Sequence, residues 1–286
     1  MEQELPKQST ESRIQHYVKA LEQFQEQDLE RMPNGTVQLR DGVAKDRRVS
    51  VEDPDMRHGR KSKKKTFTGY KEHVAGDLAT KLILACVVTP ADQPDHDAAD
   101  ALKADIEGQG FDIGELNIDR GYLKSVAVEH LEKEGGEVVC KPWRIANNNK
   151  GMFTKADFDI NIRDKTITCP AGQTERFELG KTVVFDPSAC ERCSLREKCT
   201  TQKSGRGRQV KIAGDEPLQK RLRTLQSTKR GRRRLRARTG IEHRLGHISA
   251  RKDPRARYIG TRKNLYDLRR SSAVLNLQTI QHQAAA

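Results

Sequence analysis

The sequence predicts a mixed α/β protein, and three features of its pattern indicate that class. Apolar runs of strand length alternate with amphipathic segments of helical length over residues 66–140. Short β-like pieces separated by Gly and Pro turns occupy residues 158–212, and basic helical segments occupy residues 213–286. In the first region the order is hairpin, helix, strand, helix, strand, which is typical of a mixed sheet with a crossover helix.

The composition favours a protein with extensive polar surface that binds polyanions. The 286 residues include 54 Lys and Arg against 40 Asp and Glu, which gives a formal charge of +14, and only 34% of the residues are hydrophobic. A field of that sign concentrates polyanions, so nucleic acid is the first partner to consider. The length allows one large domain with an insertion, or two domains.

The sequence predicts neither a membrane segment nor a secretory signal. No apolar run approaches the roughly 20 residues that a helix needs to cross a bilayer, and the stretch MEQELPKQSTES at the N-terminus is polar and acidic. These features predict a cytoplasmic protein. In a reducing compartment its six cysteines would bind metal more often than they would form disulfides.

The N-terminal region predicts one amphipathic helix followed by a polar loop. Between residues 11 and 31, apolar side chains recur at roughly helical spacing: Ile14, Val18, Leu21, Phe24 and Leu29. Pro33-Asn34-Gly35 ends the helix, and residues 36–65 show no periodic pattern. This polar segment closes with a basic run that includes Arg60 and Lys61. Such a run is typical both of a solvated loop and of an arm that follows a phosphate backbone.

Four strands and two helices are expected in the next region. Residues 66–75 alternate loosely and residues 78–89 are rich in Leu, Ile and Val, so these two strands should pair as a hairpin around Gly76 and Asp77. The remaining expected elements are a helix at 98–109, a strand at 113–118, a helix at 123–134 and a strand at 136–140. Cys86 and Cys140 lie inside apolar strands and are expected to be core residues.

Asp119 is the first candidate for a catalytic residue. The strand at 113–118 ends at this carboxylate, and Arg120-Gly121-Tyr122 begins a turn directly afterwards. Open α/β sheets place their active sites at such strand ends. A solvated aspartate in a turn has the same local sequence, so the assignment depends on other residues of the chain.

Four clustered cysteines predict a structural metal site. Cys169, Cys190, Cys193 and Cys199 follow the spacing C-x20-C-x2-C-x5-C. A C-x2-C pair places two thiolates on one ion through a tight turn, and two further thiolates complete the tetrahedral shell of Zn²⁺. Because all four ligands would be cysteines, no position remains for a reactive water, and the metal would be structural. The alternative is four unrelated reduced cysteines.

The segment from residue 216 to residue 247 predicts basic helical structure that carries a second candidate acid. Arginines dominate it, and Ile241 and Leu245 at i and i+4 indicate a face that packs on the sheet. On one interpretation Glu242 is a salt-bridged surface residue. On the other it lies opposite Asp119, where two carboxylates would bind Mg²⁺ or Mn²⁺ while arginines hold a phosphodiester. That arrangement suits phosphoryl transfer.

The C-terminal segment predicts another amphipathic helix with a basic first half. Its expected apolar face comprises Leu265, Leu268, Val274, Leu275 and Ile280. Tyr266 lies among cations that include Arg262 and Lys263, as in surfaces that follow a nucleic-acid backbone. A core position for Tyr266 fits the spacing equally well.

Several of these segments together resemble the DDE transposases of bacterial insertion sequences. The resemblance rests on Asp119-x-Gly121-Tyr122, on the four cysteines and on Arg238-x3-Glu242, and it runs from about Asp28 to Gln278. It extends to a subgroup that carries the segments DPDMRHGRKSKKKTFTGYKEHVAGD, IDRGY, CPAGQT, CERCSLREKCT and RYIGTRKNLYDLRR.

The resemblance implies an RNase H-like mixed sheet with flanking helices, interrupted by a small zinc-ribbon-like insertion that holds the four cysteines. The implied regions are an N-terminal helix and basic linker at 1–65, the first part of the core at 66–157, the zinc-binding insertion at 158–212 and basic helices that complete the core at 213–286. The implied activity is cutting and joining of DNA strands at element ends, with two metal ions held by three acids.

The resemblance also assigns residues to roles. The family's second acid corresponds to Asp119 and its third to Glu242, with Arg238 one helical turn earlier. Two positions depart from the family, since Leu235 replaces a tyrosine and Ser249 replaces a basic residue. The residues expected to contact DNA are Arg60, Lys61, Arg238, Arg244, Arg262 and Lys263.

The family's first acid has no counterpart at the expected position. In the family it lies on a strand upstream of the hairpin, whereas Asp41, Asp46 and Asp55 lie in polar sequence and Asp77 lies in the hairpin turn. The sequence therefore predicts the C-terminal portion of a split, frameshifted or decayed transposase, inactive alone unless an N-terminal half supplies the missing strand. Two other classes stay open: a non-catalytic, zinc-stabilised nucleic-acid-binding protein, and a remnant without activity.

Overall fold

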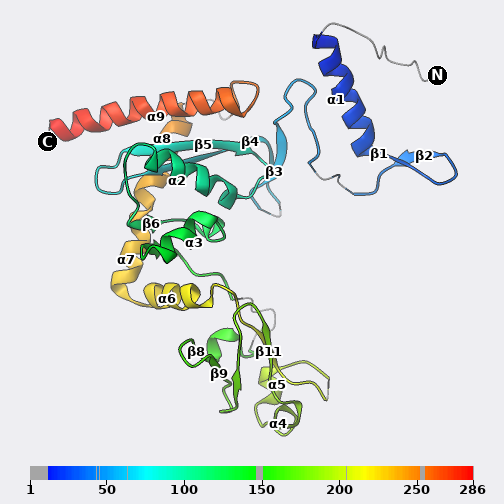
Figure 1. Ribbon diagram of the computed structural model, residues 1–286, viewed down its shortest axis with the longest axis vertical. Coiled ribbons are helices and arrows are strands. Elements are labelled where there is room, and N and C mark those ends of the chain that lie inside the picture. Colours follow the sequence, from blue (N-terminus) through cyan, green and yellow to red (C-terminus); the bar gives the residue numbers. More distant parts are fainter. Residues whose placement is uncertain are drawn as a thin grey trace. The chain divides into compact units, whose positions relative to one another are not determined.

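The chain divides into two compact units, whose elements are labelled in Figure 1. The computed structural model describes residues 12–42, 44, 46–62, 64–145, 151–203, 205–251 and 255–285. Unit 1 consists of Met1–Val138 together with Ala237–Ala286, and unit 2 consists of Val139–Arg236. In the chain, unit 2 therefore interrupts unit 1.

The first helix of unit 1 is shorter than predicted, and a hairpin follows it. Helix α1 spans Ser12–Asp28, and strand β1, Leu29–Arg31, replaces the last turn of the predicted helix. β1 pairs antiparallel with β2, Val37–Leu39, so part of the segment predicted to be a loop is a strand. The turn between them holds Gly35 at φ +82°, a left-handed conformation that glycine adopts without steric cost. Asn34-Gly35 therefore makes the turn of the β1–β2 hairpin, and the helix ends earlier, at Asp28.

A three-stranded antiparallel sheet forms the centre of unit 1. β4, Thr66–Gly76, pairs with β5, Ile83–Pro90, so the predicted hairpin is confirmed, although its second strand begins at Ile83 and not at residue 78. β4 also pairs with β3, Arg57–Arg60, a strand inside the predicted polar loop. Lys61 and Lys65 of the basic run thus belong to the turn of the β3–β4 hairpin. Its polar composition hides β3 from a search for apolar alternation.

Helices cover both faces of this sheet (Figure 1). α8, Thr239–Arg251, and α9, Thr261–Ala284, pack on one face, and α2, Ala99–Glu107, packs on the other. The first core comprises Ile83, Cys86, Val88, Ile248, Leu268 and Leu275. The second comprises Ala85, Leu102 and Ile106. Adjacent residues of β5 belong to different cores because successive side chains of a strand point to opposite faces.

The next elements follow the predicted order, but their strands form a separate sheet. They are η1 (Asp95–Ala98), α2, β6 (Glu115–Asn117), η2 (Arg120–Tyr122), α3 (Val126–Lys133) and β7 (Glu137–Val139). β6 pairs with β7 alone. Within the described part of the chain, no strand joins this pair to β3–β4–β5, so two sheets stand where one mixed sheet is expected. Cys86 and Cys140 are both buried, as predicted.

The predicted basic helix is interrupted. α6 spans Glu216–Ser227 and α7 spans Lys229–Ala237, and Thr228 between them is extended (φ −86°, ψ 152°). Gly231 N donates to Thr228 Oγ1 at 3.0 Å, so the hydroxyl caps the new helix. A Cβ at Gly231 would lie 1.7 Å from Leu225 O, which makes glycine necessary at this tight connection. Arginine and leucine favour helix on both sides of the break, so periodicity alone misses it.

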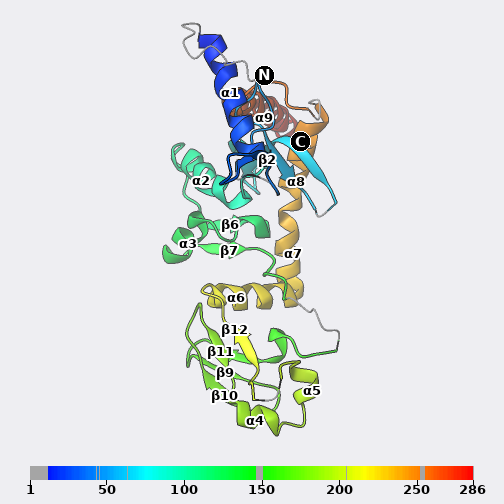
Figure 2. The same cartoon turned by 90° about the vertical axis from the view of Figure 1, so that its right-hand side faces the viewer.

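Unit 2 consists of short antiparallel strands around an apolar core (Figure 2). β8 (Asp159–Asn161), β9 (Thr166–Thr168) and β10 (Thr174–Arg176) form one sheet with β9 in the middle. β11 (Thr182–Val184) pairs with β12 (Gln209–Lys211) in another. The short helices are η3 (Lys155–Asp157), α4 (Pro187–Glu191) and α5 (Arg196–Cys199). Phe158, Ile160, Ile167, Phe177, Val183, Phe185, Val210 and Ile212 make the core.

α9 in unit 1 buries only a narrow stripe. Leu268 and Leu275 are buried as predicted, whereas Val274 is 46% exposed, Ile280 49% and Tyr266 69%. These last three positions do not belong to the core, because a helix that lies across a sheet contacts it along one side only. Although α9 has 24 residues, no described helix is long and apolar enough to cross a membrane.

Candidate active site

Asp119 lies just beyond the end of β6 and begins the following turn. Its backbone is extended (φ −83°, ψ 160°), and its Oδ1 accepts a hydrogen bond from Arg120 N at 2.8 Å. The carboxylate therefore caps η2. Its side chain remains 64% exposed, so the backbone orients an acid that is accessible to a ligand.

Asp119 and Glu242 both form ion pairs with the guanidinium of Arg238. Arg238 Nη1 lies 3.4 Å from Asp119 Oδ1, and Arg238 Nη2 lies 2.9 Å from Glu242 Oε1. Glu242 belongs to the first turn of α8, where its backbone N bonds to Arg238 O. Glu242 is 53% exposed and Arg238 24% exposed. Two acids from distant parts of the sequence are thus paired with the same cation.

Asp95 lies against the turn that follows Asp119. A Cβ at Gly121 would lie 2.8 Å from Asp95 Oδ2, so a side chain at this position would have to displace Asp95. Lys71 Nζ donates to Asp95 Oδ1 at 2.9 Å, which ties the turn to β4. The sequence pattern places Asp95 in a loop and gives no indication of this contact.

Tyr122 anchors the same turn inside unit 1. Its hydroxyl lies 2.6 Å from His73 Nδ1, and His73 Nε2 lies 3.0 Å from Thr89 Oγ1. Burial lowers the pKa of His73, although the charge of Asp95 opposes that shift. Burial also raises the pKa of the Tyr122 hydroxyl, and the charges of Asp95 and Asp119 add to the effect. A neutral imidazole and a neutral phenol therefore fix Tyr122 to β4 and β5.

The packing of α8 fixes the position of Glu242. Ile241 lies against β4, since a Cβ at Gly76 would come within 2.9 Å of Ile241 Cδ1, and Ile248 is fully buried. This agrees with the predicted packing of the helix on the sheet. Arg244 Nη1 donates to Thr279 Oγ1 of α9 at 2.6 Å. Arg244, predicted to contact DNA, therefore links two helices with at least one of its nitrogens.

The start of α9 is held by a polar segment more than half the sequence away. Gly260 N donates to Tyr70 Oη at 3.0 Å and to Asp53 Oδ2 at 3.3 Å. Thr261 N and Thr261 Oγ1 both donate to Asp55 Oδ2 at 2.9 Å. Asp55 thus supplies the cap that Gly260, the N-cap residue, lacks. Sequence reasoning assigned no role to this Asp-Pro-Asp segment.

The remaining cations predicted to contact DNA are exposed. Arg262 and Lys263 lie in the first turn of α9, directly after the segment that Asp55 caps. Arg60 and Lys61 lie at the β3–β4 hairpin, whose turn is closed by a bond from Lys61 N to Lys65 O of 2.8 Å. Arg262 and Lys263 are therefore presented on a helix, and Arg60 and Lys61 at the end of a strand and in the turn that follows it.

The four cysteines of unit 2 line one small cavity of about 30 Å³. Cys169, Cys190 and Cys199 also pack against the apolar core. Burial raises the pKa of the Cys199 thiol, Arg208 lowers it, and the other three cysteines raise it further. None of the four forms a disulfide, and each is half-buried. Four side chains spread over 31 positions of sequence, from 169 to 199, are thus drawn to one place.

Neither set of residues forms a complete metal centre as it stands. Throughout the residues that the structure describes, no three His, Cys, Asp or Glu side chains are arranged so that they could hold a metal ion. Asp119 and Glu242 are paired instead with Arg238, and the cysteines surround a cavity without meeting that arrangement.

Comparison with protein families identifies part of the chain. Residues 168–281 match the family described as "Transposase DDE domain". The matched segment contains the four cysteines, Arg238 and Glu242, and it begins after Asp119. The predicted resemblance to DDE transposases is thereby confirmed. Comparison with curated proteins gave no match, and neither did comparison with solved structures.

Proposed function

We propose that this chain, which belongs over residues 168–281 to the DDE transposases, takes part in metal-dependent phosphoryl transfer at the ends of an insertion sequence. The proposal rests on the ion pairs that Asp119 and Glu242 both form with Arg238. One acid comes from the end of a strand and the other from the start of a helix, and both are accessible. Carboxylates that face one point are suited to a hard divalent cation.

Asp119 and Glu242 are the residues that would hold Mg²⁺ or Mn²⁺. Their fit rests on their oxygen donors and on the cation that already pairs with both. A bound divalent metal would supply activation of a water or a 3′-hydroxyl and stabilisation of the leaving oxygen in a displacement at phosphorus. Arg120 N orients Asp119, and α8 orients Glu242. Arg238 neutralises both acids and has the planar donor geometry that binds a phosphate group.

We infer that the third acid is supplied by a partner polypeptide, such as the N-terminal half of a split transposase. Two acids that precede Asp119 are committed elsewhere: Asp55 caps α9, and Asp77 accepts bonds from Thr80 N and Oγ1 in the hairpin turn, both at 2.7 Å. The chain alone should then bind DNA weakly without cutting it.

We propose that the exposed cations at the β3–β4 hairpin and in the first turn of α9 bind the DNA backbone. Arg60, Lys61, Arg262 and Lys263 are exposed, and the half-buried Arg244 lies on α8, where its Nη1 donates to Thr279. Affinity through such contacts should fall with salt, with a slope of about −0.9 in log K per log salt for each phosphate neutralised.

Cys169, Cys190, Cys193 and Cys199 are proposed to hold one structural Zn²⁺. The support is their common cavity and their chemistry, since four thiolates match the tetrahedral preference of zinc. The metal would tie α4 and α5 to the turn at Cys169 beside the core of unit 2. It would leave no coordination position for catalysis.

Binding of Mn²⁺ to the full chain, measured by electron paramagnetic resonance of the free ion, tests the two acids. Asp119→Asn and Glu242→Gln should each weaken binding by about tenfold or more. Asp112→Asn removes an exposed acid of unit 1 outside the site and should bind as the wild type does. An equal affinity for Mn²⁺ in the wild type and the three variants would overturn the assignment. Mg²⁺-dependent cleavage of DNA by the wild-type chain alone, lost in Asp119→Asn, would instead refute the need for a further segment.

A further inference from the structure

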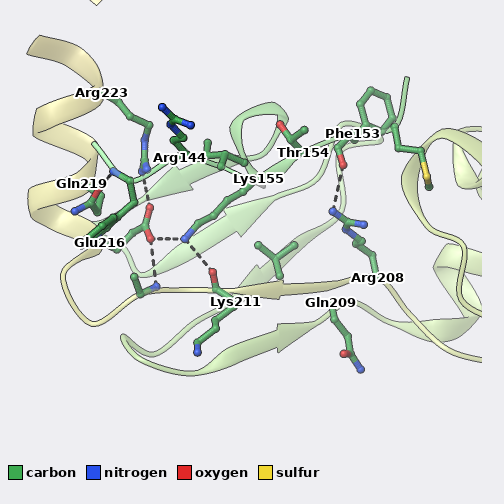
Figure 3. A pocket seen from close by; sticks show the side chains of 15 residues that line it. Arg144, Phe153, Thr154, Lys155, Arg208, Gln209, Lys211, Glu216, Gln219 and Arg223 are labelled. Carbon is green, nitrogen blue, oxygen red and sulfur yellow. Dashed lines mark hydrogen bonds and ion pairs between the residues drawn. The ribbon is translucent and has the colours of Figure 1, made fainter. Parts of the chain in front are cut away.

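Unit 2 contains a cationic cavity that none of the preceding assignments uses. Its volume is about 560 Å³, within the range of small-molecule sites. It is lined by β12, by one side of α6 and by the segments 143–145 and 152–155, as Figure 3 shows for the labelled side chains. The volume is enough for one nucleotide but not for a double helix.

One face of α6 forms the floor of this cavity. Glu216, Gln219 and Arg223 are spaced at i, i+3 and i+7, which places them on one side of the helix. Gln219 Oε1 accepts from Trp143 N at 2.8 Å, and Gln219 Nε2 donates to Asp215 Oδ2 at 2.8 Å. The buried amide of Gln219 therefore fixes the backbone at Trp143 against α6.

Glu216 is a buried carboxylate that two of the lining cations neutralise. It is 1% exposed, and Lys155 Nζ and Arg223 Nη2 both donate to it, as the dashed lines in Figure 3 show. Burial raises the pKa of Glu216, but the bonds from Lys155 and Arg223 outweigh burial, so the pKa lies below its usual range. Glu216 is thus ionised, and its charge is already balanced within the protein.

The positive charge that lines the cavity exceeds the negative charge that lines it. Five cations, Arg144, Lys155, Arg208, Lys211 and Arg223, line the cavity together with the single carboxylate. The side chains of Arg144 and Lys211 are exposed and have no ion-pair partner within the described residues. Arg208 donates to Cys199 O and Phe153 O, while its buried Nε finds no acceptor in the described part of the chain. An anionic ligand would balance this excess charge.

The cavity also offers an aromatic surface. Trp143, the one tryptophan of the sequence, and Phe153 both line it. Aromatic side chains beside cations bind single-stranded nucleic acid, because bases stack on the rings while Lys and Arg hold the phosphates. In a duplex the base faces are already stacked on their neighbours, so only an unpaired nucleotide can place its base against Trp143.

We propose that this cavity binds an unpaired nucleotide of a DNA strand, with its phosphate at Arg144 and its base against Trp143. The choice of DNA rests on the proposed function, whereas the cationic and aromatic lining does not depend on Asp119 or Glu242. The site belongs to unit 2 alone. It requires no metal ion and no strand cleavage.

The fluorescence of Trp143 tests the proposal in the full chain, because no other tryptophan contributes. Single-stranded oligothymidylate should quench it, with an affinity that falls by about 0.7 in log K per log salt for each phosphate bound. Arg144→Ala should weaken binding by about threefold to tenfold. Arg163→Ala removes an exposed cation of unit 2 that does not line the cavity, and it should bind as the wild type does.

Three further ligands separate the sources of binding. An abasic strand of the same length should bind more weakly and leave the fluorescence nearly unchanged, and thymidine monophosphate and duplex DNA should each bind more weakly than the single strand. Absence of quenching by oligothymidylate, equal loss in Arg163→Ala and Arg144→Ala, or equal affinity for the mononucleotide or duplex would overturn the proposal. Because Mn²⁺ binding is measured separately, these failures would leave the assignment of Asp119 and Glu242 unaffected.

Discussion

Arg238 Nη2 lies 2.9 Å from Glu242 Oε1, one helical turn away, and the same guanidinium reaches Asp119 across the fold. In this state Arg238 is the shared counter-charge of two acids that would otherwise repel each other. A divalent cation that binds the same carboxylates must compete with that pairing.

Replacement of Arg238 should therefore strengthen metal binding. In Arg238→Gln the acids lose two partly exposed ion pairs, which together are worth at most about 1 kcal/mol, so the affinity for Mn²⁺ should rise by about threefold to fivefold. Arg236→Gln removes a neighbouring exposed cation and should have little effect. A lower affinity for Mn²⁺ in Arg238→Gln would show that the arginine positions the acids for the metal and does not compete with it.

Removal of the cap at α9 should destabilise unit 1. Asp55→Ala deletes the acceptor for Thr261 N and Thr261 Oγ1, and loss of a helix cap costs about 1 kcal/mol. The urea midpoint, followed by circular dichroism, should shift accordingly. Asp112→Ala, an exposed acid outside any element, is the control and should unfold like the wild type. An unchanged midpoint in Asp55→Ala would contradict the capping role.

His73 should make the stability of unit 1 depend on pH near neutrality. Burial lowers its pKa in the folded protein, whereas an unfolded histidine titrates near about 6.5. The unfolded chain therefore binds the proton more readily, so stability is complete above about pH 6.5 and declines as the pH falls toward the folded pKa, by up to about 1.4 kcal/mol per unit. His73→Gln should abolish this slope, and His243→Gln, at an exposed position of α8, should retain it.

Glu216 should be important for the stability of unit 2. Glu216→Gln leaves Lys155 and Arg223 without their buried counter-charge, and breaking a buried ion pair costs about 3 kcal/mol. Since the folded pKa of Glu216 is lowered, its contribution is present above about pH 4.3 and is lost as the pH falls through the folded pKa. Trp143 fluorescence in urea reports the change. Glu178→Gln breaks the exposed pair with Lys181 and should leave the midpoint unchanged.

The sequence predicts those elements whose cause is local. The apolar run at 78–89 predicts β5, and the strand-to-turn change at 118–121 predicts the place of Asp119. Asp53 and Asp55 escape prediction because their partners, Tyr70 and the start of α9, come together only through tertiary folding.

In the candidate site, too, one contact follows from local sequence and another depends on tertiary packing. Residue type and helical spacing predict that Arg238 can meet Glu242, because i and i+4 are neighbours on a helix. Their approach to Asp119 depends on the packing of α8 against β4, which no local pattern contains. The cavity in unit 2 is likewise invisible in sequence, since Trp143, Arg144 and Lys211 lie on segments that meet only in the folded unit.

The cysteine cavity predicts the metal content of the protein. Purified chain should contain about one Zn²⁺, measured by mass spectrometry of the metal, and should lose it when the thiols are modified. Cys193→Ser should lose the metal, because three thiolates hold zinc less well than four. Cys86→Ala, in the core of unit 1, should keep it. Wild-type protein without zinc, or Cys193→Ser with full zinc, would show that the four cysteines pack together only as half-buried side chains.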